Sequence, residues 1–174
     1  DGFVATAAHP GRPDVLTAWM DAAVVDENDP VATDPDLDLF NEDNGPPYSP
    51  EFVQRYRAAQ VARNEAITDW VEAELKRIRA AGFVDRPFSV MRTWADPRMV
   101  DPGLDPSKRL PNRCYSGVPV HANRSARGIA AFCTLLNWLS MWSLRHAQTR
   151  AEPHLQRIDC PALVIDAEQD TGVF

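Results

Sequence analysis

The stretch CPALVIDAEQDTGVF, residues 160–174, decides the fold. Pro161 opens an apolar run, Ala162–Ile165, and acidic residues follow it. A short apolar run bounded by a breaker is typical of a strand buried on both faces, and a proline, which lacks an N–H, marks its start. In parallel sheets, ligands bind beyond the carboxyl ends of the strands. The stretch therefore predicts a strand of a parallel sheet with candidate active-site carboxylates after it.

A second apolar run, FVATAA at residues 3–8, has the same character and is closed by His9–Pro10–Gly11. The two runs predict neighbouring strands of one parallel sheet. A parallel crossover needs only about a dozen residues, whereas residues 9–161 lie between these runs. We therefore expect an α/β protein in which a large, mainly helical subdomain is inserted between two core strands.

The insertion contains one helix with clear start and stop signals, besides a short helix expected around residues 14–20. Ser49 is a suitable N-cap, Pro50 fits the first helical position, and Gly82 suits the position just after the last turn. Apolar residues recur between them at helical spacing. The length of this helix leaves room for a kink near Arg63–Asn64, and Arg63, which falls on the apolar stripe, is expected to be paired or to extend toward solvent.

The most apolar part of the insertion, Gly128–Leu144, predicts a buried amphipathic helix, and residues 88–93 before it predict a short strand. Trp138 and Trp142 are spaced to share a face of that helix. Two interpretations are open for this face, on which we also place Leu135: it packs in the core, or it lines an apolar substrate pocket.

Composition limits the classes of partner. The 174 residues are 44% hydrophobic and 25% charged with a net charge of -7, which is typical of a soluble domain and argues against nucleic acid or an anionic membrane as the main partner. Three widely spaced cysteines favour a reduced, cytoplasmic setting over a disulfide framework or a zinc site. The sequence shows no phosphate-binding or metal-binding motif, so we expect no cofactor and no metal. The oligomeric state stays open.

Three acids follow the second strand: Asp166, Glu168 and Asp170. A carboxylate at this place can hold a histidine in one tautomer and stabilise its imidazolium during acyl transfer. Asp170 is the first choice, because Thr171–Gly172 allow a sharp turn that aims its side chain, and Asp166 is the fallback. A turn acid with a purely structural role remains the alternative. No serine lies in a GxSxG nucleophile elbow.

The segment HLQRIDCPALVIDAEQDTGVF, residues 154–174, resembles the strand-seven region of α/β-hydrolases, which has the pattern I-x-x-P-[AT]-L-V-I-x-[GA]-x-x-D. The matching residues are Ile158, Pro161, Ala162, Leu163, Val164, Ile165, Ala167 and Asp170. GFVATAAHPGR, residues 2–12, resembles strand six of the same fold. The resemblance implies a strand-six region at residues 1–13, a helical cap at 14–153, and strand seven with the acid turn at 154–174.

The resemblance further implies an esterase-like hydrolase that acts on a small apolar acyl substrate by Ser-His-Asp catalysis. Asp170 is then the acid, and Leu135, Trp138 and Trp142 contact substrate. The serine and the histidine are expected outside these residues, which makes the chain an internal piece of a longer hydrolase and inactive alone. Two alternatives are a non-enzymatic helical binding module anchored by two strands, and a different α/β enzyme in which Asp170 binds a metal or phosphate.

Overall fold

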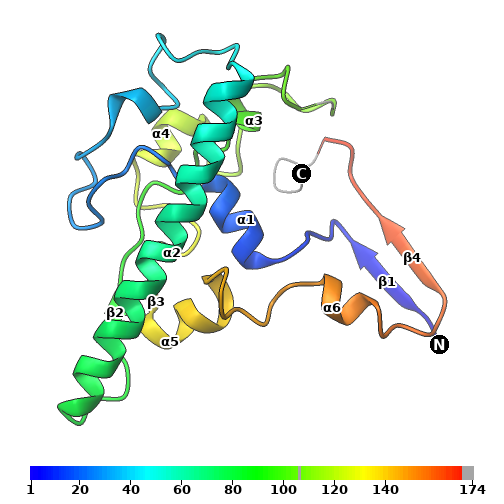
Figure 1. Ribbon diagram of the computed structural model, residues 1–174. Coiled ribbons are helices and arrows are strands. Elements are labelled where there is room, and N and C mark those ends of the chain that lie inside the picture. The colour runs from blue at the N-terminus through cyan, green and yellow to red at the C-terminus, as the bar shows by residue number, and fades with distance from the viewer. Residues whose placement is uncertain (106, 170–174) are drawn as a thin grey trace.

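The computed structural model describes residues 1–105 and 107–169. Strands β1 (Phe3–Thr6) and β4 (Ala162–Ile165) lie side by side in Figure 1 and pair in parallel, residue for residue from their first positions. Ala7, just beyond β1, extends the ladder by donating its N–H to the carbonyl of Ile165 at 2.8 Å. The predicted strands and their parallel pairing are confirmed, and the chain is of the α/β type.

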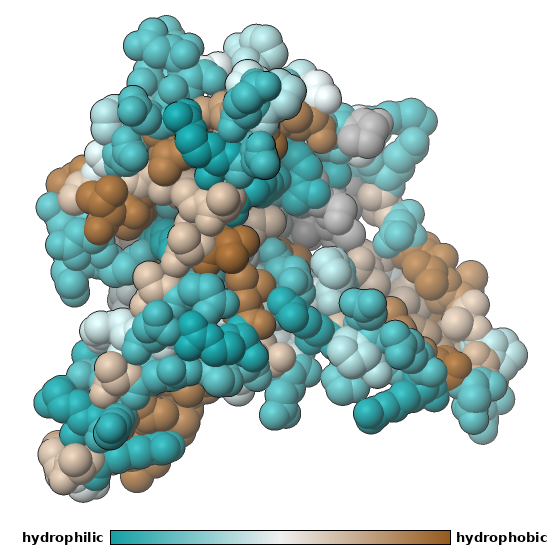
Figure 2. Space-filling view, in the orientation of Figure 1, coloured by the Kyte–Doolittle hydropathy of each residue, from teal (hydrophilic) through white to brown (hydrophobic). Residues whose placement is uncertain are grey.

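The prediction that both strands are buried on both faces is wrong for the described residues. All four residues of β4 are exposed, and Val4 of β1 is 61% exposed. Figure 2 shows apolar side chains at the surface of this sheet. The physical reason is that these two strands form the whole sheet among the described residues, and the helices lie beside it instead of across its faces (Figure 1).

Helix α2 (Pro50–Ala80) has the termini that its sequence predicts. Ser49 Oγ accepts a hydrogen bond from the N–H of Phe52 at 3.1 Å, and Pro50 occupies the first turn. At the other end, Gly82 adopts a φ of 85°. This left-handed residue lets the N–H of Phe83 reach the carbonyl of Ile78 at 3.1 Å, which completes a Schellman motif.

Helix α2 continues without a break through Arg63 and Asn64, where the sequence allowed a kink. Both side chains are buried and bind other segments of the chain. Asn64 donates to Thr17 Oγ1 and to the carbonyl of Trp142, each at 3.0 Å. Arg63 pairs with Glu27, so the prediction of a paired arginine is confirmed. Arg63 and Asn64 therefore connect α2 to neighbouring segments of the chain, Asn64 through hydrogen bonds and Arg63 through an ion pair.

The predicted helix over Gly128–Leu144 is wrong in its first part. Strand β3 (Cys133–Thr134) precedes a short α5 (Leu135–Asn137), which continues as the π-helix η2 (Trp138–Trp142). Ala130 has a φ of 57°, outside the helical region, and a Cβ on Gly128 would lie 2.5 Å from Thr93 Oγ1, so residue 128 packs directly against residue 93. Helical structure begins only after Thr134, whose Oγ1 accepts from the N–H of Asn137 at 3.2 Å.

The remaining elements are short, and they include a two-residue strand where a longer one was predicted over 88–93. Strand β2 (Pro87–Phe88) pairs antiparallel with β3. The helices are α1 (Arg12–Trp19), the 3-10 helix η1 (Pro35–Leu37), α3 (Pro97–Val100), α4 (Pro119–Asn123) and α6 (Glu152–Leu155).

The apolar core lies entirely in the helical insertion, residues 14–153. Three clusters of buried side chains compose it. The first joins α1, α2, Val90 and the α5–η2 turn, the second surrounds Tyr56, and the third surrounds Trp19 and Trp94. None of the clusters includes a residue of β1 or β4. The insertion therefore has its own hydrophobic core, as an independent folding unit does.

A buried ionic group ties the loops of the insertion together. The carboxylate of Asp21 is fully buried, pairs with Arg92 at 2.7 Å and accepts from Asn123 Nδ2 at 2.7 Å. Asn123 Oδ1 accepts in turn from the N–H of Trp94 at 3.1 Å. Buried charges persist in proteins where they are paired and hydrogen-bonded in this way. This network connects the loop after α1 with α4 and with the segment at residues 92–94.

Within the described ranges, no helix combines the length and the apolar character that crossing a membrane requires.

Candidate active site

The chain enters the helical insertion through residues 10–14 and leaves it through residues 150–151. These two segments lie against each other, and we call them the neck. The N–H of Ala151 donates to the carbonyl of Pro10 at 2.7 Å, and Gly11 and Arg150 form an antiparallel bridge. The guanidinium of Arg150 also pairs with Asp14 at 3.1 Å. The chain therefore enters and leaves the insertion at one place, and α6 lies between the neck and β4.

The carboxyl ends of β1 and β4 define the candidate active site, because parallel pairing brings both to the same edge. Asp166 directly follows β4 and is exposed. Glu168, two residues on, pairs with Lys108 at 3.0 Å across exposed surface. This ion pair connects the turn after β4 to the proline-rich segment of the insertion. Asp170, the predicted triad acid, lies outside the described residues.

No catalytic Ser–His pair is assembled among the described residues. The hydrogen-bonded histidines use other partners: His146 contacts Glu72, and His154 contacts the carbonyl of Gln148 at 3.4 Å. Burial raises the pKa of the Cys133 thiol to about 12 and also raises the pKa of Cys114. Both thiols are therefore protonated near neutral pH and are poor nucleophiles.

The three predicted substrate contacts lie together around α5 and η2, with their polar atoms bonded within the protein. Leu135 and Trp138 are fully buried, and Trp138 donates its indole N–H to Thr68 Oγ1 at 3.0 Å. Trp142 is half-buried and donates to Asn137 Oδ1 at 3.1 Å. In this conformation Leu135 and Trp138 contact only protein, so their role toward a substrate stays a prediction.

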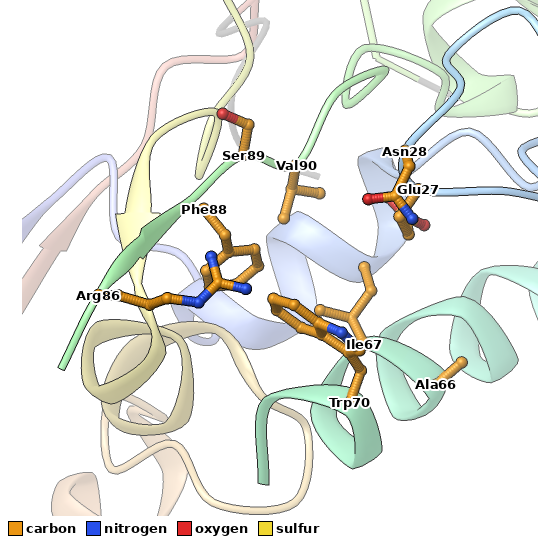
Figure 3. A pocket seen from close by; sticks show the side chains of 9 residues that line it. All are labelled: Glu27, Asn28, Ala66, Ile67, Trp70, Arg86, Phe88, Ser89 and Val90. Atoms are coloured by element: carbon orange, nitrogen blue, oxygen red, sulfur yellow. The ribbon is translucent and has the colours of Figure 1, made fainter. Parts of the chain in front are cut away.

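A cavity of about 260 Å³ opens beside α2, between that helix, β2 and the loop at residues 27–28 (Figure 3). Its lining is mainly apolar and consists of Glu27, Asn28, Ala66, Ile67, Trp70, Arg86, Phe88, Ser89 and Val90. Phe88 also contacts Trp138, with ring centroids 6.0 Å apart, so the cavity borders the same core that contains the predicted contacts.

The sequence contains a signal for this cavity in the spacing of α2. Ile67, Val71, Leu75 and Ile78 follow one another by three or four residues and are buried. Trp70 directly precedes Val71, and adjacent helical residues cannot share a face. Trp70 therefore lies at the edge of the buried stripe, where it is 42% exposed and lines the cavity together with Ile67, three residues before it.

Among the residues that the structure describes, no three His, Cys, Asp or Glu side chains come close enough to hold a metal ion.

Comparison with protein-family models, with curated proteins and with solved structures gave no match to this chain.

Proposed function

We propose that residues 1–174 form the cap and the acid-bearing strand of an α/β-hydrolase that cleaves an ester or a similar acyl bond. The observation that supports it most is the parallel pairing of β1 and β4 around an insertion whose two ends meet at the neck. The insertion begins after the carboxyl end of β1, and the chain returns through α6 to the amino end of β4, which leaves the carboxyl end of β4 free to contribute to a site.

In the proposed mechanism, a serine oxygen attacks the acyl carbon while a histidine removes its proton. The histidine then protonates the departing alcohol, and water hydrolyses the acyl-enzyme by the same two steps. Asp170 holds the histidine in the correct tautomer. The serine and the histidine come from outside residues 1–174, since the sequence contains no GxSxG elbow. The substrate is a small apolar acyl compound, in keeping with the apolar residues around α5 and η2.

The test compares two carboxamide substitutions in the protein encoded by the complete reading frame. Asp170→Asn should lower kcat toward p-nitrophenyl butyrate by about 10⁴-fold, the loss known for a triad acid replaced by its amide. Asp166→Asn is the matched control, because it removes a neighbouring charge after the same strand. It should stay within a few-fold of the unmodified protein. Circular dichroism and thermal melting show whether both variants are folded.

The reverse pattern, with Asp166→Asn inactive and Asp170→Asn active, would identify Asp166 as the acid. Full activity in both variants would refute a triad acid after β4. Residues 1–174 alone should show no turnover and no labelling by a fluorophosphonate, which reacts with activated serines. If the complete protein also escapes labelling and turns over no ester, the non-enzymatic binding module is the better description.

A further inference from the structure

We propose that the cavity in Figure 3 binds a small aromatic carboxylate, at a site separate from the carboxyl edge of the sheet. This inference goes beyond the proposed hydrolase function and does not depend on it, because it concerns α2, β2 and the loop at residues 27–28 only.

The walls suit a flat apolar body. Trp70 and Phe88 lie with ring centroids 5.2 Å apart and planes at 58°, and Ile67 and Val90 complete the apolar surface. Rings at such an angle offer a third ring both a stacked and an edge contact. A volume of about 260 Å³ is just below the ~300 Å³ at which pockets for drug-sized ligands begin. One or two fused rings therefore match the space.

Two polar groups of the cavity are donors that have no acceptor within the described residues. Both carboxylate oxygens of Glu27 accept from Arg63. By contrast, the indole N–H of Trp70 and the Nη2 group of Arg86 donate to no other group in the described part of the chain. Polar groups in a binding site should each find a partner once water is excluded. A ligand that satisfies these donors must supply acceptors.

The guanidinium of Arg86 is fixed in place before any ligand arrives. Its Nε donates to Glu74 at 2.6 Å, its Nη1 donates to the carbonyl of Pro87 at 3.0 Å, and it stacks over the Trp70 ring at 5.2 Å. Figure 3 shows Arg86, Phe88 and Trp70 on one side of the cavity, opposite Glu27. A carboxylate is the acceptor that a guanidinium binds best. A cationic ligand is disfavoured, since Arg86 already covers Trp70.

The experiment measures binding of 2-naphthoate to the whole chain by isothermal titration calorimetry, with 2-naphthylmethanol as the uncharged probe. A buffer with 150 mM salt screens the net charge of -7, which would otherwise repel an anion. Arg86→Gln should weaken naphthoate binding by at least about tenfold, as expected for loss of a charged hydrogen bond, with little effect on naphthylmethanol. Trp70→Phe, which keeps a ring and removes the N–H, should weaken naphthoate by about fivefold.

Arg77→Gln is the matched control, because Arg77 also binds Glu74 and does not line the cavity. It should leave both affinities unchanged. Melting temperatures report whether each variant is folded. Absence of naphthoate binding to the unmodified chain, or equal affinity in the unmodified chain and Arg86→Gln, would overturn the proposal. Both outcomes leave the hydrolase proposal unaffected, since they are read as binding and not as turnover.

Discussion

Replacement of Arg63 by methionine removes the most connected cation of α2 while keeping an unbranched side chain of good helix propensity. The Arg63 side chain is 5% exposed and makes five hydrogen bonds: two to Glu27, and one each to the carbonyls of Asp21, Met91 and Arg92. These bonds connect the middle of α2 to two loops of the insertion.

The cost of Arg63→Met follows from what each partner loses. The Glu27 side chain is 34% exposed, so water replaces part of its ion pair and little of the loss falls there. The carbonyl of Arg92 still accepts from the N–H of Asp21 at 2.9 Å. The carbonyl of Met91 keeps no other partner among the described residues. We therefore expect a loss of about 3 kcal/mol, the upper end for a buried acceptor left without its hydrogen bond.

Urea denaturation followed by circular dichroism and tryptophan fluorescence measures this loss. A loss of about 3 kcal/mol corresponds to a midpoint lower by ~1–2 M urea for a domain of this size. Arg77→Met is the matched control: Arg77 also lies on α2 and binds both oxygens of a glutamate, Glu74, but its side chain is 69% exposed. Its removal should leave the urea midpoint nearly unchanged, because solvent screens an exposed ion pair. If the two variants differ by less than about 1 kcal/mol, the Arg63 contacts do not hold the insertion together.

Two further predictions concern titratable groups. Hydrogen bonds from Arg77 and Arg86 lower the pKa of Glu74 from its ordinary 4.5 to about 2. The contribution of Glu74 to stability is therefore present above pH 4.5 and is lost as pH falls toward 2. The urea midpoint of Glu74→Gln should lie below that of the unmodified chain at pH 7, and the two midpoints should converge at pH 2. Burial raises the pKa of Cys133 to about 12 and also raises that of Cys114. Both of these thiols should therefore react slowly with Ellman's reagent in the folded protein at pH 8, whereas Cys160, which is not buried, should react quickly. Fast reaction of more than one thiol, or an unchanged fast phase in Cys160→Ser, would contradict this.

Helix α2 and the paired strands could be predicted because their signals are local. Ser49, Pro50 and Gly82 each satisfy a requirement of a helix end that depends on the neighbouring residues only. The parallel pairing of β1 with β4 followed from two short apolar runs, each closed by breakers. In both cases the local preferences of the chain agree with its final structure.

The segment Gly128–Leu144 could not be predicted in the same way, because the obstacle to a helix is distant in sequence. Its composition suits a helix, but Gly128 passes against Thr93, and Ala130 has a φ of 57°, outside the helical region. The exposure of β4 was missed for a related reason: apolar composition indicates what a strand could bury, while its burial depends on the elements that cover it.

The candidate site was predictable only as a location. Parallel pairing places Asp166 at the carboxyl edge, as the sequence indicates, whereas Asp170 lies outside the described residues. The cavity beside Trp70 depends on β2 and on the loop at residues 27–28, whose approach to α2 no local pattern encodes.

The neck has a consequence for protein engineering. Since Gly11 and Arg150 are bridged, the chain between them begins and ends at nearly the same point in space, and it carries its own hydrophobic core. Segments with these two properties are the ones that tolerate transplantation into a surface loop of another protein, or replacement by a short turn. We therefore expect that residues 12–149 can be moved as one unit into a host loop that supplies one pair of bridged residues.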